Sequence, residues 1–460
     1  MTRPNLFFVC VDCLRGDFVG TGHADTPFLD GLAERGVHYT DMYATATTTT
    51  PAVTSFMTGT YSERNGVYSL EEARLNADVP TLAEHLSAAG YDTRALVTGP
   101  IVAETGLDRG FDDYDYRDRR AELVGDWYDE AVAATADLEE PFFLYLHLWE
   151  VHTPVDVPGE FDDPAYGRYP YARALSALDR SLADFREELP ANTAVALHGD
   201  HGEAVAYRDS YLHKLCKFLR TGFRYGLGVD TRALERRLKR RFDRDPPIPD
   251  HFMEDGHGEN VFDFTANVPF VVAGPDVDAA TVDAQVRQVD VMPTLLDLVG
   301  VDREETVPAA VAADGGPEAG RTGEGDAGGL GKGDADGLGE GDAGGLAEGG
   351  GESAPPIDGE SLLPADGVTD RDAYMRACGK SLVREKNWQR AVRANGWKYV
   401  EYPERDWEPE LYDLDADPAE LHPVSDDRRA SRLRARFPEE RMRDGEKLEI
   451  DGLLEDLGYK

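Results

Sequence analysis

The chain has 460 residues, 41% of them hydrophobic, so it is long enough to bury a large core and to hold two or three domains. Its formal net charge of −41 excludes a general affinity for nucleic acid, because the phosphate backbone would be repelled. No apolar run approaches the roughly 18 residues of a transmembrane segment. The first run, 6–11, is short and leads directly into Asp12, so we expect no cleavable signal and a cytoplasmic protein.

The cationic residues are unevenly divided, with nine lysines and 39 arginines among the 48. A high acid content with scarce lysine resembles the composition of proteins from salt-loving archaea, whose charged surfaces hold water and counter-ions. The composition therefore predicts a halophilic protein, and it says nothing about the reaction.

Short, nearly continuous apolar runs predict strands that are buried on both faces of a sheet. These runs are 6–11, 93–97, 142–148, 193–197 and 268–273. Helical patterns lie between them, at 26–36, 81–90 and 293–299. Thr26 is the expected N-cap of the first helix, with Pro27 at its first position and Gly36 at its end. This alternation predicts an α/β fold with a mostly parallel sheet flanked by helices.

The four cysteines are too few and too scattered for a disulfide framework. Cys10 and Cys13 form a Cys-x-x-Cys, but no second pair or redox motif accompanies them. We interpret Cys10 as a buried strand residue and Cys13 as a residue that lies near a site for other reasons.

Two segments interrupt the α/β pattern. Residues 302–356 are rich in Gly, Asp and Glu and contain three eight-residue units that begin at Gly325, Gly333 and Gly341, so they predict a disordered linker or inserted loop. Residues 208–244 carry twelve Lys/Arg against four Asp/Glu, within an inserted segment 208–250. This segment is either a helical excursion with a solvated basic face or a lid that attracts an anionic substrate or partner.

The expected domain organisation follows from these interruptions. Residues 1–301 form the catalytic α/β domain, and 357–460 form a smaller C-terminal α+β subdomain and tail. The subdomain is predicted from strand-like pieces at 388–392 and 397–402 and from a helix near the end.

Polar residues follow three of the predicted strands. Asp12 follows the first strand, Asp200 and His201 follow the strand at 193–197, and the strand at 142–148 contains His147 and leads to His152. The carboxyl ends of parallel strands meet at one edge of a sheet, where ligands bind. Carboxylates and imidazoles gathered there predict a divalent metal site, since each ligand alone would be costly to desolvate.

A threonine-rich stretch, 46–59, precedes a predicted helix. A hydroxyl at a helix N-terminus lies where the helix dipole and backbone N–H groups hold an anion, and a metal activates it as a nucleophile. The alternative is a loop whose hydroxyl groups only cap the helix.

Several separated motifs, in order, resemble the sulfatase family of the alkaline phosphatase superfamily. The stretches that carry the resemblance are 4–6 with 12–15, 26–30, 51–59 with Tyr61, 80–83 with 90–91, 147–154, 199–203, 268–270 with 274–275, 290–296, 358–364, and 411–414 with 417–418. The resemblance implies an alkaline-phosphatase-like α/β fold with a small C-terminal subdomain. Together with the composition, it suggests a haloarchaeal member of the family.

The resemblance also implies roles for individual residues. Asp12, Asp200 and His201 match the family's metal ligands, whereas Cys13 falls where many sulfatases have a second aspartate. His152 matches a histidine that contacts the leaving-group oxygen, His257 resembles a further active-site histidine, and His147 is a third candidate. Arg15 and Thr50 are candidates for contact with the anionic group, and a structural ion pair is the alternative for Arg15.

The nucleophile departs from the family pattern. Sulfatases have Cys-x-Pro-x-Arg, or serine in place of the cysteine, which is oxidised to formylglycine. Here Thr49 takes that position, and threonine cannot form the aldehyde; Val53 replaces the arginine, and 99–102 replace the family's Gly-Lys-Trp-His. Thr49 coincides with the threonine nucleophile of related phosphodiesterases and phospho-group transferases. Within the run 47–50, Thr48 and Thr50 remain alternatives.

We therefore predict a metal-dependent hydrolase of a phosphate or sulfate ester, with Thr49 as nucleophile and as a further metal ligand. The alternatives are transfer of a phospho-group to a lipid or sugar acceptor, and a catalytically silent, metal-bound binding protein. The expected ion is calcium or magnesium, with manganese and zinc as alternatives. The expected substrate is an anionic ester, either a small molecule or a glycan; the sequence predicts no oligomeric state.

Overall fold

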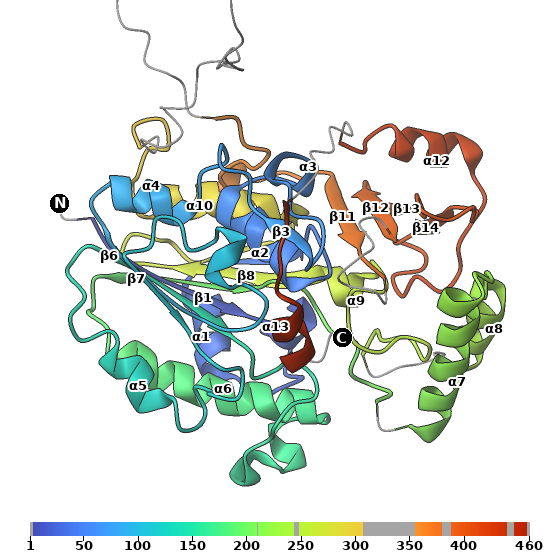
Figure 1. Cartoon of the computed structure of the whole chain (residues 1–460), viewed down its shortest axis with the longest axis horizontal. Helices are drawn as coiled ribbons and strands as arrows, with labels where there is room; N and C mark the ends of the chain where they lie inside the picture. The colour runs from blue at the N-terminus through green and yellow to red at the C-terminus, as the bar shows by residue number, and fades with distance from the viewer. Residues whose placement is uncertain are drawn as a thin grey trace, which may run out of the picture.

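The structure, a computed structural model, describes residues 3–208, 210–242, 248–306, 355–379, 388–438 and 446–457. Nine strands form the central sheet: β1 (Asn5–Val11), β2 (Val37–Tyr43), β4 (Asp92–Val97), β5 (Asp113–Tyr116), β6 (Phe142–Leu148), β7 (Thr193–Gly199), β8 (Asn267–Ala273), β9 (Ala280–Val282) and β10 (Val286–Arg287). Their order is β10-β2-β8-β7-β1-β6-β4-β5, with β9 also paired to β2 (Figure 1). All five strands predicted from apolar runs are present.

The sheet is mostly parallel, as predicted. β1 pairs in parallel with both β6 and β7, whereas β8 runs antiparallel to its neighbours β7 and β2. Every residue of β1, β6 and β7 is buried, which explains why these strands read as continuous apolar runs.

Helices cover both faces of the sheet (Figure 1). One face carries α2 (Thr49–Thr58), α4 (Leu82–Ala88) and α10 (Val291–Leu298), and the other carries α1 (Pro27–Arg35), α5 (Tyr128–Ala133) and α6 (Pro170–Glu187). Alternate residues of β1 belong to the two hydrophobic layers on either side of the sheet. Phe8 packs with Phe56 of α2 in one layer, and Phe7 packs with Phe185 of α6 in the other.

Short elements connect these layers. They are α3 (Ser62–Asn65), α9 (Asp263–Ala266), η1 (Gly16–Phe18), η2 (Ala103–Thr105), η3 (Gly159–Phe161), η4 (Pro164–Tyr166), η6 (Gln288–Asp290) and η7 (Ala365–Gly367). In the described ranges, no helix combines the length and the apolar character needed to cross a membrane.

The N-terminus of α1 differs from the sequence prediction. The Thr26 side chain makes no capping bond and instead donates to Asp30 Oδ1 at 3.0 Å. The free N–H groups of Phe28 and Leu29 donate to the carboxylate of Asp179 in α6, at 3.1 and 2.8 Å. The helix start at Pro27 was correctly predicted, but its capping group comes from a distant helix.

The C-terminal part forms a second, antiparallel sheet in the order β11 (Ala373–Ala377), β12 (Gln389–Ala394), β13 (Trp397–Glu401) and β14 (Glu410–Asp413), packed against α12 (Asp427–Arg434). The chain then returns to the main body. β15 (Glu446–Lys447) pairs with β3 (Glu72–Arg74), and Leu454 of α13 (Asp451–Asp456) packs against Val67 and Leu70. Most of the predicted linker 302–356, including its three repeats, lies outside the described residues.

The basic segment is helical, as predicted, but only some of its cations face solvent. It forms α7 (Tyr211–Thr221), the π-helical turn η5 (Gly222–Gly226) and α8 (Arg232–Phe242), which lie together below the C-terminal sheet in Figure 1. Arg220, Arg224 and Lys239 are buried, whereas large apolar side chains of the same helices are exposed. The prediction of a solvated basic face is therefore confirmed only in part: Arg220 and Lys239 are buried in ion pairs with acidic side chains, whereas other cations of the same helices, Lys214, Arg237, Arg240 and Arg241, are exposed.

Candidate active site

The order of the strands brings the predicted ligands together. β1 lies between β7 and β6, and its last residue, Val11, is in register with Gly199 of β7 and Leu148 of β6. The residue after β1, Asp12, therefore lies beside the residue after β7, Asp200. This is the carboxyl edge of the parallel strands, where the sequence places the site.

The turn after β1 is tied directly to Asp200. Cys13 adopts a left-handed conformation with φ of 65°, and its backbone N–H donates to Asp200 Oδ1 at 3.0 Å. The N–H of His201 donates to the same oxygen at 2.8 Å. Gly199 is needed here, since a Cβ at this position would lie 2.2 Å from the carbonyl oxygen of Leu14. The backbone thus holds the two aspartates at fixed positions.

The acidic cluster has the properties of a cation site. Asp12 and Asp200 are completely buried, and among the described residues Asp12 Oδ1 and Asp200 Oδ2 accept no hydrogen bond. Burial raises the pKa of Asp12 well above its ordinary value, and the charge of Asp200 raises it further. Two adjacent buried carboxylates are costly unless a cation compensates them.

Two overlapping groups of side chains fit such an ion. Asp12, His147 and Asp200 offer ligand atoms within 4.8 Å of one another, and so do Asp12, Cys13 and His201. The structure thus places His147 beside the carboxylates of Asp12 and Asp200. The orphaned carboxylate oxygens and the mixture of oxygen, nitrogen and sulfur donors fit a divalent metal.

Thr49 is the threonine of the run 47–50 whose hydroxyl touches this cluster. It is the first residue of α2 and is completely buried. Its Oγ1 lies 3.3 Å from Asp12 Oδ2, to which it donates, and 3.3 Å from His201 Nε2. By contrast, Thr47 and Thr50 donate to the carbonyl oxygens of Asn260 and Pro100.

Three histidines form the wall next to the cluster. The ring of His257 lies 4.3 Å from that of His201 and 5.1 Å from that of His152, centre to centre. His152 also stacks on Trp149 at 4.0 Å, and neither of its ring nitrogens has a hydrogen-bond partner in the described part of the chain. Burial lowers the pKa of His152 to about 3 and that of His201 to about 4.

The sequence profile of the sulfatase family matches residues 4–301, which is more than half of the chain. The chain belongs to the sulfatase family. Choline-sulfatase from Rhizobium meliloti (strain 1021) is 25% identical over 383 residues, covering 66% of this chain and 69% of that enzyme. This chain is therefore a sulfatase-like ester hydrolase of the alkaline phosphatase superfamily.

Solved structures support the same fold. The phosphonate monoester hydrolase of Agrobacterium radiobacter superimposes with a TM-score of 0.63 at 17% identity, covering 94% of each chain. A protein in the alkaline phosphatase superfamily from Vibrio parahaemolyticus superimposes with a TM-score of 0.54 at 17% identity, covering 95% of this chain and 85% of that one. At these identities the likeness establishes the alkaline-phosphatase-like fold.

Glu203 is a site residue that the sequence prediction did not include. It is fully buried, and its Oε2 lies 3.3 Å from both His257 Nδ1 and the thiol of Cys13. Burial by itself would raise the pKa of the Glu203 carboxyl, but the hydrogen bond with His257 lowers this pKa below its ordinary value. Its position at the end of the family's Gly-Asp-His-Gly-Glu motif was the available signal, but its partner is 54 residues away.

Arg15 and Thr50, the two residues predicted to contact the anionic group, instead bind other groups of the protein. The buried guanidinium of Arg15 pairs with Asp17 at 2.8 Å and with Asp250, and it donates to the carbonyl oxygen of Glu203 at 2.8 Å. The Thr50 hydroxyl donates to Pro100 at 2.8 Å. The geometry therefore favours the structural alternative for Arg15 and leaves neither group directed at a substrate.

We expect Arg15→Ala to lower the free energy of unfolding by about 3 kcal/mol, because Asp250 would remain buried without its cation. Denaturant unfolding of the two proteins measures this change. The matched variant Arg15→Lys keeps the charge and should recover part of the loss. A large rise in KM without any loss of stability would instead show that Arg15 binds the substrate.

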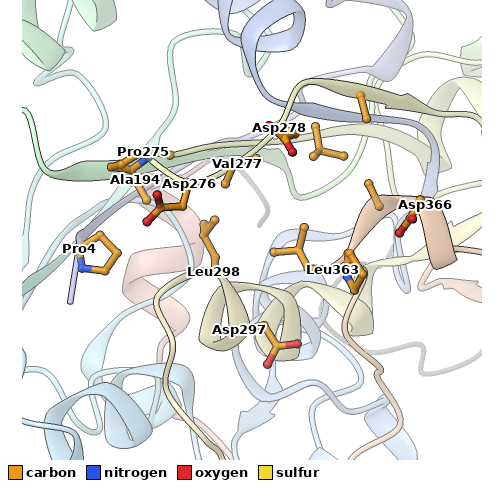
Figure 2. A pocket seen from close by; sticks show the side chains of 15 residues that line it. Pro4, Ala194, Pro275, Asp276, Val277, Asp278, Asp297, Leu298, Leu363 and Asp366 are labelled. Atoms are coloured by element: carbon orange, nitrogen blue, oxygen red, sulfur yellow. The ribbon is translucent and has the colours of Figure 1, made fainter. Parts of the chain in front are cut away.

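A cleft at the amino-terminal ends of the parallel strands, opposite the carboxyl ends that carry the candidate site, does not take part in this site. It has a volume of about 680 Å³ and is lined by residues that include Pro4, Ala194, Val277 and Leu298 (Figure 2). Pro4 and Ala194 lie at the amino-terminal ends of β1 and β7, far along the strands from Asp12 and Asp200. The predicted catalytic residues all lie at the carboxyl edge.

Proposed function

We propose that the protein hydrolyses a phosphoric or sulfuric ester of a small molecule or glycan, with Thr49 as its nucleophile. The observation that carries this proposal is the contact of Thr49 Oγ1 with both Asp12 and His201, at 3.3 Å each. A hydroxyl that only capped the helix would bond to the backbone of α2, which the Thr49 hydroxyl does not do among the described contacts.

Asp12, Asp200 and His201, with Thr49, would hold the divalent ion. When bound, such an ion lowers the pKa of a nearby hydroxyl and offsets negative charge on the ester oxygens. The thiol of Cys13 near the same atoms adds a soft donor, which favours zinc more than an all-oxygen site would, whereas calcium, magnesium and manganese prefer the carboxylate oxygens.

The reaction proceeds in two displacements. Thr49 Oγ1 attacks the phosphorus or sulfur, its proton leaves along the hydrogen bond to Asp12, and the bond to the leaving alcohol breaks. The product is an ester on Thr49. Water then attacks the same centre and gives a proton to His257, the bond to Thr49 Oγ1 breaks, and the proton held by Asp12 returns to restore the hydroxyl. The N-terminus of α2 directs its backbone dipole at the transferred anion in both steps.

His257 is the best-positioned proton donor for the leaving oxygen. Glu203 contacts its Nδ1, which orients the ring and leaves Nε2 without a partner in the described residues. The ring of His152 lies 5.1 Å from that of His257 and is the second candidate for contact with the leaving group. Glu203 is therefore a positioning residue for His257.

The charge of the site favours a monoanionic ester. Three carboxylates, those of Asp12, Asp200 and Glu203, are buried there, and Arg208 lies 3.7 Å from Glu203. One divalent ion and one guanidinium would roughly balance them, and the proton that His257 donates in the proposed step adds about one more positive charge, which suits a monoanion better than a dianion. A sulfate monoester, phosphodiester or phosphonate monoester fits better than a phosphate monoester.

A side-by-side assay tests the proposal. Nitrophenyl esters of sulfate, phosphate, phosphonate and a phosphodiester are offered in high salt with calcium, magnesium, manganese or zinc. We expect turnover of at least one monoanionic ester at a higher kcat/KM than of the phosphate monoester. An absence of turnover with every ester and metal would contradict hydrolysis and favour a silent binding protein.

A further inference from the structure

The hairpin formed by α7, η5 and α8 presents an apolar surface to solvent. Twelve large hydrophobic side chains are exposed in the described residues, and ten of them belong to this segment. We call these ten the apolar face: Tyr211, Leu212, Leu215, Phe218, Leu219, Phe223, Leu227, Val229, Leu234 and Phe242. Phe218 is 74% exposed and Leu227 is 71% exposed. Singly scattered apolar residues are ordinary on a protein surface, but ten of them concentrated in one hairpin indicate a binding surface.

The polar side of the hairpin fixes its orientation. Arg220 pairs with Glu254 at 3.0 Å and with Glu259, and Lys239 pairs with Glu254 at 3.2 Å. Arg236 pairs with Glu410 of β14 at 2.6 Å. If the apolar face were turned inward, Arg220 and Lys239 would lose their acidic partners, and breaking such buried ion pairs is strongly unfavourable. The outward direction of the apolar face is therefore a stable property of the fold.

Aromatic stacking strengthens the same attachment. The guanidinium of Arg224 lies 5.4 Å from the ring centre of Trp388 and 5.2 Å from that of Trp407, and Arg232 lies 4.3 Å from that of Tyr402. Each such contact stabilises the packing of the C-terminal part against the inner side of the hairpin.

Cations of the same hairpin are exposed as well. Lys214, Arg237, Arg240 and Arg241 are exposed. The acids of 210–242 are Asp230 and Glu235 alone. Asp230 pairs with Arg232 at 2.8 Å, and Glu235 is buried beside Arg220. The exposed charge of the hairpin is thus positive, on a chain whose net charge is −41.

We propose that the hairpin docks the protein on a lipid membrane surface that carries anionic headgroups. The apolar side chains enter the boundary between headgroups and acyl chains, and the exposed cations pair with the headgroups. α7 and α8 have 11 residues each, too short to span a bilayer, which takes about 20 residues. The hairpin therefore lies in the interface.

A second copy of the chain fits the hairpin less well. A symmetric contact between two apolar faces would bring the four exposed cations of one copy against those of the other. The segment offers no exposed acid that pairs with them across the contact, apart from Asp230, which Arg232 already occupies. Like charges across an interface oppose association, whereas an anionic surface is attracted.

Vesicle flotation of the full-length protein tests the proposal, at the lowest salt at which its melting temperature is unchanged. The vesicles contain phosphatidylcholine alone or phosphatidylcholine mixed with phosphatidylglycerol. We expect the protein to float with the anionic vesicles. The double variant Phe218→Ser, Leu227→Ser should lower the partition coefficient by at least about tenfold, because two apolar side chains no longer enter the lipid. Arg240→Glu with Arg241→Glu should also weaken it.

Val424→Ser is the matched control, since Val424 is 43% exposed but lies outside the hairpin. It should float as well as the unchanged protein. All variants should keep the same melting temperature, because the substituted side chains already face solvent. No flotation with either vesicle, or flotation that Phe218→Ser, Leu227→Ser leaves unchanged, would overturn the proposal. So would a doubling of the solution mass that this double variant abolishes while no vesicle is bound, which would assign the face to a second copy.

Discussion

Replacing Thr49 by alanine is expected to reduce kcat/KM by at least about 10³-fold, because the reaction would lose its nucleophile. Thr49 Oγ1 lies 3.3 Å from Asp12 Oδ2 and from His201 Nε2, and no other hydroxyl of the run 47–50 has a described contact with these residues. The measurement is steady-state kinetics on whichever ester the enzyme turns over best. Intact-mass analysis of the rapidly quenched enzyme should show the added phospho- or sulfo-group on the unchanged protein but not on Thr49→Ala.

Two controls separate the chemistry from the packing. Thr49→Ser keeps the hydroxyl and should retain most activity, whereas Thr48→Ala removes the neighbouring hydroxyl, for which no partner is described, and should change the rate little. If Thr48→Ala were inactive and Thr49→Ala active, the nucleophile would be assigned wrongly. Adding an acceptor alcohol distinguishes hydrolysis from group transfer: a new ester would identify a transferase.

Replacing Asp200 by asparagine is expected to weaken divalent-metal binding on the order of 10²-fold or more, since a charged ligand becomes neutral. Asp200 Oδ1 accepts hydrogen bonds from the backbone, but Oδ2 accepts none among the described residues and is the oxygen left for the ion. Isothermal titration of the metal-free protein measures the affinity. In the unchanged protein a chelator should abolish turnover, and one of the four ions should restore it.

Thermal unfolding provides a second readout for this variant. Metal at 100 times its dissociation constant stabilises the native state by about 2.7 kcal/mol, so the melting temperature of the unchanged protein should rise on addition of metal. Asp200→Asn should lose this rise at the same concentration. Glu203→Gln is the control, because it should keep the metal and lose activity through His257. Equal metal affinity in Asp200→Asn and the unchanged protein would show that the ion, if any, binds elsewhere.

The sequence by itself determined the strands and the edge that carries the site. The central strands are buried on both faces, so their apolar runs are continuous and their ends are sharp. The parallel arrangement of β7, β1 and β6 then requires Asp12 and Asp200 to be neighbours. The family motifs in their fixed order identified the same residues, and the family itself, without any coordinates.

Only the tertiary structure decided which side chains share a contact across long stretches of chain. Four adjacent threonines are equivalent in a sequence, and Thr49 is distinguished by Asp12 and His201, 37 and 152 residues away. Glu203 becomes a site residue only because His257 folds back to it. Arg15 is held in a buried ion pair by Asp250, which lies 235 residues later in the chain.

The orientation of the hairpin is a further feature that only the tertiary structure decides. Helical periodicity establishes that α7 and α8 each have an apolar and a basic face, but it does not say which face meets the protein. That choice depends on Glu254, Glu259 and Glu410, which lie outside the hairpin and bind its cations. Because burying a cation is tolerable only beside its partner, these distant carboxylates fix Arg220 and Lys239 on the inner side of the hairpin and leave the apolar side chains outward.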